Sequence, residues 1–273
     1  MKIFVTGIKG QLGSEVVKLL GNSTIGVDVD EIDLSAAESV PAIYDGIDAV
    51  IHCAAYTAVD KAESDPVLAR AINANGTRKI AEFAKRNNAK LIYISTDYVF
   101  DGEKDGIYEP DDIVNPQSVY GSTKLGGELA VKGLLNRYFI VRTSWVFGKG
   151  NNFVKTMLRL ADTQSEISVV SDQVGSPTYA ADLAKLLVEM IKTEKYGTYH
   201  ATNEGFCSWY DFACEIFRRA GKTMKVNPIS TEQYPAPAKR PRNSRLSKQK
   251  LADSGFKLLP DWQNALERYL KEL

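Results

Sequence analysis

The stretch MKIFVTGIKGQLGSEVV (residues 1–17) contains three glycines spaced three apart, Gly7, Gly10 and Gly13. An apolar run precedes them and a helical pattern follows, which predicts a strand, a tight turn and a helix. The first glycine would allow the turn, the second would let the backbone approach a pyrophosphate, and the third would let the helix pack on the strand. Because free amides at a helix start attract phosphate, we predict a phosphate-binding turn. The spacing is GxxGxxG rather than GxGxxG, and an ordinary strand–helix turn is the alternative.

A carboxylate about 20 residues further along supports a dinucleotide site. Asp28 ends the second apolar run, in GVDVD. It would accept hydrogen bonds from the adenosine ribose, and its charge would repel a 2′-phosphate, which favours NADH over NADPH. Asp30 is the competing carboxylate, and Asp33 and Leu34 would border the adenine.

Apolar runs alternate with helical periodicity through the first half of the chain. They occupy residues 2–7, 23–30, 48–55, 90–96 and 137–148. Short runs that are apolar throughout are typical of strands buried on both faces. Their alternation with helices predicts an α/β fold, a doubly wound parallel sheet of the Rossmann-like kind. We assign residues 1–150 to this dinucleotide-binding domain.

After residue 150 the rhythm changes. Residues 151–273 are predicted to form mainly a smaller, mixed α/β domain for the substrate, closing over the carboxyl edge of the sheet. The chain is expected to return to the first domain at about 174–194, and 197–205 predicts a short strand. Ser208 and Asp261 have the residue types and positions of helix N-caps.

The composition is that of an ordinary globular protein, with 44% hydrophobic and 25% charged residues in 273. No apolar run reaches the roughly 18 residues of a membrane span, and the N-terminus indicates a strand rather than a signal segment, so we expect no membrane partner and a cytoplasmic location. A net charge of zero argues against nucleic acid as a partner. Three cysteines give no disulfide framework, and two histidines, His52 and His200, give no metal-ligand cluster.

One segment is locally basic. KRPRNSRLSKQK, residues 239–250, carries six basic residues and no acid. Such a patch fits an anionic small molecule. A solvated face is the alternative.

Catalytic chemistry is suggested by YGSTK, in which Tyr120 and Lys124 stand at i and i+4 on a predicted helix face. A neighbouring ammonium would lower the pKa of the phenol toward the range useful in acid–base catalysis. Thr96 ends the run 90–96, where parallel sheets bind ligands, and its hydroxyl would donate to a substrate carbonyl beside Tyr120. Each feature alone has a structural alternative, because Tyr-x-x-x-Lys occurs on helices by chance and Thr often starts a turn.

Together these features resemble the extended short-chain dehydrogenase/reductase superfamily over essentially the whole chain. The motifs are TGIKGQLG (6–13), HCAAYTAVDKAE (52–63), STDYVFDG (95–102), YGSTK (120–124) and RTSWVFG (142–148). With DQVGSPT (172–178) and RPRNSRL (240–246), the sequence is similar to the dTDP-4-dehydrorhamnose reductase family.

The resemblance implies reduction of the 4-keto group of dTDP-4-dehydro-β-L-rhamnose to dTDP-L-rhamnose, with NADH preferred or NADPH. Tyr120 would give the proton, Lys124 would tune Tyr120, and Thr96 would polarise the carbonyl. The cofactor-binding residues would be Gly7, Gly10, Gln11, Leu12, Gly13, Asp28, Asp33, Leu34, Ala54, Ala55, Tyr56, Thr57, Tyr120 and Lys124. Asn73, in NANGT, would support this site from behind; a polar helix face is its alternative.

Substrate binding is implied for Thr96, Asp97, Tyr120, Trp145, Arg240 and Arg245. Trp145 would offer a flat apolar face to a deoxysugar, whereas a strand Trp is more often core. Arg240, Arg242 and Arg245 would neutralise the substrate pyrophosphate, and the sequence leaves open which one does. Arg242 stands where family members commonly have a small residue, so it is the weakest of these three candidates.

Two other functions remain open from sequence. The related 4,6-dehydratases resemble STDE after the fourth strand, whereas here Tyr98 stands where that acid would be. A non-catalytic dinucleotide-binding subunit is the second alternative. Some relatives hold Mg²⁺ between the subunits of a homodimer; the sequence shows neither the ion nor the dimer.

Overall fold

The apolar runs of the first half form neighbouring strands in a computed structural model, which describes residues 1–36 and 40–273. The six strands of the main sheet are β1 (Ile3–Thr6), β2 (Thr24–Val27), β3 (Ala49–His52), β4 (Lys90–Thr96), β5 (Tyr138–Thr143) and β10 (Gly197–His200). They lie in the order β10-β5-β4-β3-β1-β2, and every neighbouring pair is parallel. The predicted parallel α/β sheet is confirmed.

The strand order reverses beside β1, and this reversal positions the site. From β1 the chain moves outward to β2 and then crosses back to β3, which lies on the other side of β1. Thr6 of β1 and His52 of β3 stand in register at the carboxyl ends of these strands. In open α/β sheets, ligands bind in the crevice at such a reversal.

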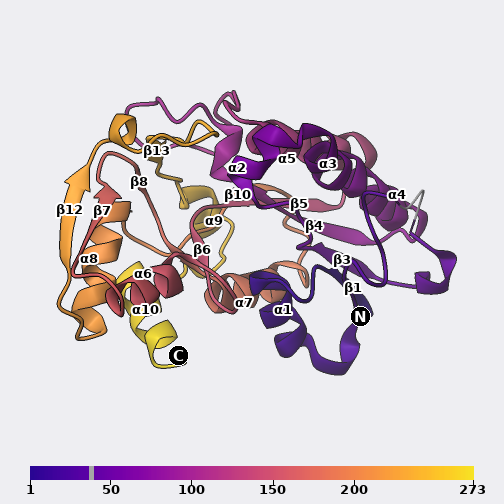
Figure 1. The fold of residues 1–273 in the computed structure, drawn as a ribbon. Coiled ribbons are helices and arrows are strands. Elements are labelled where there is room, and N and C mark those ends of the chain that lie inside the picture. The colour runs from indigo at the N-terminus through magenta and orange to yellow at the C-terminus, as the bar shows by residue number, and fades with distance from the viewer. Residues whose placement is uncertain (37–39) are drawn as a thin grey trace.

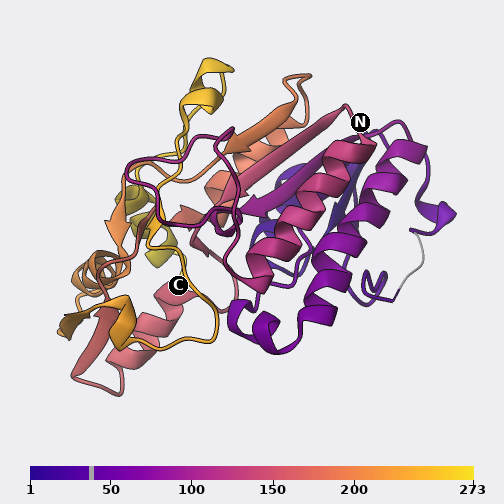
Figure 2. The same cartoon turned by 90° about the horizontal axis from the view of Figure 1, so that it is seen from above.

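Helices cover both faces of the sheet (Figures 1 and 2). α1 (Gln11–Leu20) and α7 (Ala180–Met190) pack beside each other on one face. α4 (Thr77–Arg86) and α5 (Val119–Leu134) lie on the other face, with α2 (Val59–Ser64) near them. Each helix turns its apolar side toward the strands, so the sheet has a hydrophobic core on each face.

The segment 65–88 does not form one regular helix. It begins with α3 (Pro66–Arg70), capped by the side chain of Asp65, which accepts a hydrogen bond from the amide of Leu68 at 3.1 Å. A π-helical segment, η3 (Ala71–Gly76), separates α3 from α4. Such π-helical turns often lie at functional sites, and this one contains Asn73.

A second lobe lies beside the carboxyl edge of the sheet (Figure 1). It contains α6 (Phe153–Ala161), β7 (Glu166–Val170), α8 (Trp209–Arg219), β12 (Lys225–Ile229) and α10 (Trp262–Leu270), around a third hydrophobic core. Ser208 forms a capping box at the start of α8, and the side chain of Asp261 caps α10, so both predicted N-caps are confirmed.

Short elements complete the fold. The short strands are β6 (Val146–Phe147), β8 (Val174–Gly175), β9 (Thr178–Tyr179), β11 (Cys207–Ser208) and β13 (Asn243–Ser244), and the remaining α-helix is α9 (Gln249–Asp253). The 3₁₀ turns are η1 (Gly21–Ser23), η2 (Ala42–Tyr44), η4 (Asp97–Val99) and η5 (Thr231–Gln233). No helix in the part of the chain that the structure describes is long and apolar enough to cross a membrane.

The second half contributes more to the sheet than 174–194 alone. α7 covers the sheet and β10 joins it as an edge strand beside β5. Leu251, Phe256 and Leu259 also belong to the core on that face. Parts of residues 151–273 thus pack into the core of the first lobe. The division into two functional domains at residue 150 stays a prediction.

Candidate active site

The glycine turn has the geometry that its sequence predicts. Gly7 has φ +71°, and a Cβ there would lie 2.7 Å from the amide nitrogen of Ala54. A Cβ at Gly13 would lie 2.1 Å from the carbonyl oxygen of Gly7. Any other residue would thus push α1 or the segment after β3 away from the turn.

The start of α1 is open to an anion. Gly10, its N-cap, offers no side-chain cap, and the first turn contains no acidic residue. The first helical hydrogen bond runs from the amide of Ser14 to the carbonyl of Gly10 at 3.1 Å. The three amides before Ser14 therefore precede the helical ladder and are available to a phosphate.

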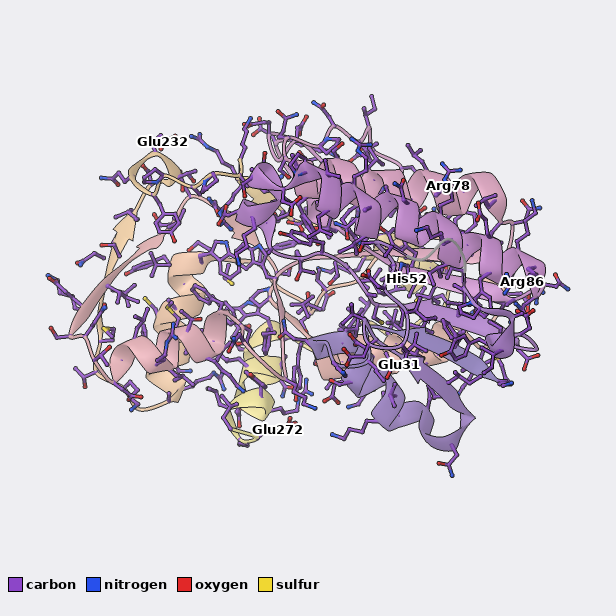
Figure 3. The ribbon with its side chains drawn as sticks, turned by 45° about the vertical axis from the view of Figure 1, so that its right-hand side comes forward. Glu31, His52, Arg78, Arg86, Glu232 and Glu272 are labelled. Atoms are coloured by element: carbon purple, nitrogen blue, oxygen red, sulfur yellow. The ribbon has the colours of Figure 1, made fainter. Side chains whose placement is uncertain are left out.

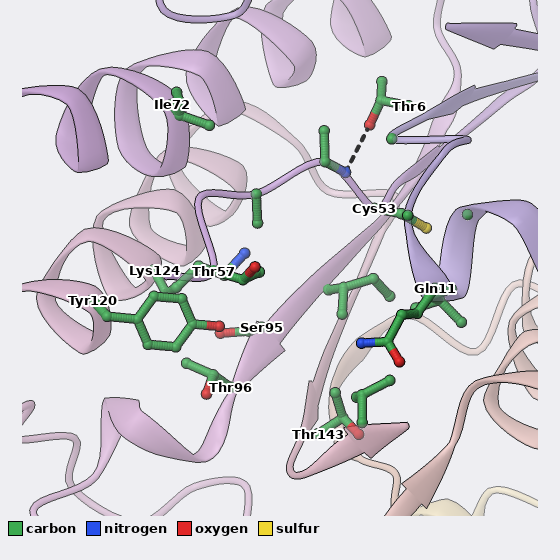
Figure 4. Close-up of a pocket in the computed structure, with 18 of the residues that line it drawn as sticks. Thr6, Gln11, Cys53, Thr57, Ile72, Ser95, Thr96, Tyr120, Lys124 and Thr143 are labelled. Carbon is green, nitrogen blue, oxygen red and sulfur yellow. Dashed lines mark hydrogen bonds between the residues drawn. The ribbon is translucent and has the colours of Figure 1, made fainter. Parts of the chain in front are cut away.

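A cavity of about 720 Å³ opens above this turn, between the two lobes. Its lining includes these predicted residues: Gly7, Gly10, Gln11, Leu12, Gly13, Asp28, Asp33, Leu34, Ala54, Ala55, Thr57, Thr96, Asp97, Tyr120, Lys124 and Trp145. Figure 4 shows Tyr120, Lys124 and Thr96 on one wall, with Gln11 and Thr143 facing them. The fold thus brings the glycine turn and the YGSTK helix to one cavity.

The cavity fits a dinucleotide. Its volume lies in the range of ligand pockets. The side-chain oxygen Oε1 of Gln11 is buried and has no hydrogen-bond partner among the residues that the structure describes, so a polar ligand group would satisfy it. The glycine turn, the free amides of α1 and Gln11 would hold the pyrophosphate side of such a ligand.

Asp28 stands at the end of β2, on the cavity wall. One of its oxygens accepts a hydrogen bond from the amide of Lys9 at 2.8 Å, and the other accepts from the amide of Val29 at 2.9 Å. Its competitor, Asp30, pairs with the ammonium of Lys9 instead. Of the two carboxylates, only Asp28 lines the cavity.

Tyr56 is not among the residues that line the cavity, although its neighbours Ala55 and Thr57 are, and its contact with the cofactor stays a prediction. Its backbone faces Asn73: the amide of Tyr56 donates to Oδ1 of Asn73 at 2.8 Å, and Nδ2 of Asn73 donates to the carbonyl of Tyr56 at 3.1 Å. Nδ2 also donates to the hydroxyl of Thr123 on α5 at 3.1 Å. Asn73 is buried and ties the segment after β3 to the helix that carries Tyr120.

α5 presents Tyr120 and Lys124 on one face. Ser118 caps the helix by accepting a hydrogen bond from the amide of Gly121 at 3.1 Å, which places both side chains in its first turns. Lys124 is 3% exposed, and its ammonium lies 4.3 Å from the centre of the Tyr93 ring. The ring of Tyr120 meets the edge of Tyr98 with centroids 5.4 Å apart.

The expected lowering of the Tyr120 pKa is wrong for this structure. Burial raises the pKa of Tyr120, the negative charge of Asp97 raises it further, and a hydrogen bond with Thr96 lowers it in part. Burial also lowers the pKa of Lys124 to about 7. The low-dielectric cavity disfavours both charged forms, an effect that residue spacing alone does not reveal. Tyr120 therefore keeps its proton, which suits a proton donor.

The hydroxyl of Thr96 donates to Oδ1 of Asp97 at 2.9 Å and accepts from the amide of Tyr98 at 3.2 Å. The hydroxyl of Ser244 donates to the other oxygen of Asp97. Burial raises the pKa of Asp97 to about 6. The predicted donation from Thr96 to a substrate thus requires its hydroxyl to turn away from Asp97.

Trp209 lines the cavity but was not predicted from the sequence. Its ring stacks on that of Trp145, which has a left-handed conformation with φ +49° and also lines the cavity. Trp209 begins α8 in the second lobe, and no local pattern marks it as part of a site. Ser144 and Asn151 also line the cavity without having been predicted.

The predicted arginines are not among the residues that line the cavity. Arg240 forms an ion pair with Asp60 on α2, with Nη2 and Oδ2 2.6 Å apart. Arg242 pairs with Glu232, and Nε of Arg245 donates to Asn243 at 2.8 Å.

Both histidines lie in the interior of the protein. Figure 3 shows His52 in the first lobe, whereas the labelled Arg86 and Glu232 lie at opposite ends of the molecule. His52 contacts the hydroxyls of Thr6 and Thr77, and burial lowers the pKa of its imidazole to about 3. Among residues 1–36 and 40–273, no three His, Cys, Asp or Glu side chains are grouped to hold a metal ion. Mg²⁺ and a homodimer stay predictions from the resemblance.

Comparisons with known proteins agree with this geometry. The family model described as the RmlD substrate binding domain matches residues 1–273. The curated dTDP-4-dehydrorhamnose reductase of Aggregatibacter actinomycetemcomitans is 43% identical, over 97% of both chains. A solved dTDP-4-dehydrorhamnose reductase from Clostridium acetobutylicum is 46% identical with a TM-score of 0.97, covering 100% of this chain and 99% of that one. Another, from Bacillus anthracis in complex with NADP, is 45% identical with a TM-score of 0.96 and covers 100% of both chains.

Proposed function

The chain belongs to the dTDP-4-dehydrorhamnose reductase family, and on this premise we propose that it reduces the 4-keto group of dTDP-4-dehydro-β-L-rhamnose to dTDP-L-rhamnose with a nicotinamide dinucleotide. One observation carries the proposal. Tyr120 and Lys124, on one face of α5, share a cavity with the glycine turn of α1. Their common cavity supports the proposal, because a proton donor and a turn with free amides would then border the same ligand.

When bound, the dinucleotide supplies the hydride that adds to C4 of the sugar. Tyr120 donates its proton to the oxygen at C4, and its raised pKa keeps that proton in place until the oxygen becomes negative. The ammonium of Lys124, one helical turn away, stabilises the phenolate that remains. Thr96, once its hydroxyl turns from Asp97, donates a second hydrogen bond to the same oxygen. Water then returns a proton to Tyr120.

We assign the sugar and the pyrophosphate of the substrate to different groups of residues. The indoles of Trp145 and Trp209 offer a flat apolar surface to the deoxysugar. Arg240 is the candidate for the pyrophosphate, because it stands beside Tyr98, a cavity residue, and is held there by an acidic partner that a phosphate would replace. Arg245 is the alternative.

We further propose NADH as the preferred cofactor, because the carboxylate of Asp28 lines the cavity at the end of β2. A 2′-phosphate close to this carboxylate would meet a like charge. Lys9 is engaged with Asp30, so its ammonium is not directed to Asp28.

The deciding experiment is an assay of NADH oxidation with the 4-keto sugar made in situ from dTDP-glucose. A reductase consumes one NADH for each sugar reduced. An epimerase or dehydratase regenerates its cofactor within each cycle, so it would show turnover of sugar without net consumption of NADH. A binding subunit would show neither.

A further inference from the structure

A buried carboxylate stands behind the acid–base pair. Glu128 lies on α5, one helical turn beyond Lys124, and is 0% exposed. Its Oε1 accepts a hydrogen bond from the hydroxyl of Ser95 at 2.6 Å. Arg142 donates to both of its oxygens, from Nε at 2.8 Å and from Nη2 at 2.8 Å. This carboxylate thus contacts two different strands, and Nζ of Lys132 on its own helix lies 3.9 Å from Oε2.

These contacts join the parts that must converge on a substrate. Ser95 immediately precedes Thr96 on β4 and stands in register with Arg142 on β5. Arg142 is 2% exposed, and its Nη1 donates to the carbonyl of Pro110 at 3.0 Å, in the loop between η4 and α5. Through Glu128, the helix that carries Tyr120 is therefore fixed to the strand that carries Thr96 and to this loop.

A buried ion pair such as Glu128–Arg142 is weak evidence for stability, because desolvation of the two charges offsets much of their attraction. The surroundings of Lys124 indicate another effect of the negative charge of Glu128. The titratable groups that face Lys124 are His52 and Cys53 from the end of β3, Tyr93 from β4, and Tyr120 and Glu128 on its own helix. Burial holds the first four close to their neutral forms, whereas Glu128 opposes the desolvation of Lys124 with a negative charge.

We propose that Glu128 is a positioning residue for the reduction: it fixes α5 against β4, and its charge favours the ammonium form of Lys124. The inference rests on the proposed function, because it assigns Glu128 a part in the chemistry of Tyr120 and Lys124. A purely structural Glu128 would affect folding and the rate, but not the pH at which the rate declines.

The test is the pH profile of kcat/KM for the 4-keto sugar at saturating NADH. Glu128→Gln keeps the shape of the side chain and removes its charge, so Lys124 should lose its proton at lower pH. An opposite charge nearby changes a pKa by roughly 1–3 units. We therefore expect the alkaline limb to move toward acid by about one pH unit or more. An alkaline limb at the wild-type position in Glu128→Gln overturns the proposal.

Two controls separate charge from packing. Ser95→Ala removes a hydrogen bond to Glu128 but leaves the charge, so the rate should decline while the limb stays. Glu128→Asp retains the charge on a shorter side chain, and should also keep the limb near its wild-type position. Movement of the limb in these two variants as in Glu128→Gln would equally overturn the proposal.

Folding is checked on each ligand-free variant by urea unfolding and by dinucleotide binding. Should Glu128→Gln fail to fold with an unpaired Arg142, the double variant Glu128→Gln/Arg142→Met removes both partners of the ion pair, so that Arg142 is no longer a buried charge without a partner. The limb of this double variant should still lie on the acid side of the wild-type limb, by less than in Glu128→Gln because the positive charge of Arg142 is lost as well, and an unmoved limb has the same adverse meaning. Wild-type protein that oxidises no NADH would instead refute the proposed function.

Discussion

The indole rings of Trp145 and Trp209 stack with their centroids 3.8 Å apart and their planes 16° from parallel. Trp145 stands between β5 and β6, beyond the carboxyl end of β5, and Trp209 is the first residue of α8 in the second lobe. The stack therefore joins the two lobes at the wall of the cavity that both rings line. Phe153 of α6 supports it, with its ring centroid 4.6 Å from that of Trp209.

Replacement of Trp209 should weaken substrate binding more than catalysis. Trp209→Ala removes the ring that holds Trp145, and a stacked aromatic pair contributes about 0.5–1.5 kcal/mol beyond its buried area. We expect KM for the nucleotide sugar to rise roughly fivefold to tenfold, since about 1.4 kcal/mol is a factor of ten. Trp209→Phe should keep most of the affinity. An unchanged KM in the alanine variant would remove Trp209 from the substrate wall.

Loss of either member of the acid–base pair should suppress turnover. Tyr120→Phe removes the proton donor and Lys124→Ala removes the adjacent ammonium. Each should lower kcat at least about a hundredfold, as is typical for general acid–base groups. Steady-state assays measure kcat, and dinucleotide binding shows whether the cavity is intact. Near-normal turnover in both variants would end the mechanistic assignment.

Stability should depend on pH through Lys124. Its pKa is about 7 in the folded protein and near 10.5 when exposed, so the unfolded chain binds more protons between these values. The free energy of unfolding should therefore rise from pH 7 to pH 9, by up to about 1.4 kcal/mol per pH unit, relative to Lys124→Met, which cannot titrate. Below pH 7 the difference between the two proteins should be constant. Urea unfolding at pH 6–9 measures it, and parallel curves over that range would contradict the lowered pKa.

Cofactor choice should follow Asp28. Asp28→Ala removes the carboxylate from the ribose end of the cavity and should move the NADH:NADPH ratio of kcat/KM toward NADPH. Asp28→Asn tests charge alone, and Asp30→Ala is a matched control because Asp30 pairs with Lys9 outside the cavity lining. If the ratio moves in the Asp30 variant and not in the Asp28 variants, the ribose ligand has been assigned to the wrong residue.

Pyrophosphate binding should depend on Arg240 and respond to its partner. Arg240→Ala should raise KM for the nucleotide sugar at least about tenfold, because a hydrogen bond to a charged group contributes roughly 1.5–3 kcal/mol. Asp60→Asn should lower KM, since it weakens the ion pair that the phosphate must replace. Arg245→Ala serves as the comparison. A larger rise of KM in this variant than in Arg240→Ala would assign pyrophosphate binding to Arg245.

Local features were predictable because their causes lie within a few residues. The strand before Gly7, the turn itself and the start of α1 follow from neighbouring residues, as do the caps Ser208 and Asp261. The i, i+4 spacing of Tyr120 and Lys124 placed them on one helix face, and the position of Thr96 at a strand end placed it near the carboxyl edge. The predicted substrate contacts of Trp145 and the arginines came instead from family resemblance.

Features that depend on distant parts of the chain were missed or mistaken. The pKa of Tyr120 was expected to fall, but burial raises it, and burial is contributed by elements far apart in the sequence. Trp209 and the pairing of Arg240 with Asp60 arise where the second lobe meets the first. The cofactor contact of Tyr56 stays a prediction, while the pairing of its backbone with Asn73 of the π-helical segment depends on the tertiary structure.

The amino-acid sequence by itself determined the order of strands and helices, the glycine turn before α1 and the pair on α5, since each depends on short-range periodicity and on where glycine is tolerated. Only the tertiary structure decided the direction of the pKa shifts of that pair and brought Trp209 beside Trp145 in the cavity wall. Those properties depend on how completely the lobes and the sheet exclude water around Lys124 and Tyr120, and solvent exclusion is a property of packing between segments that the chain order does not bring together.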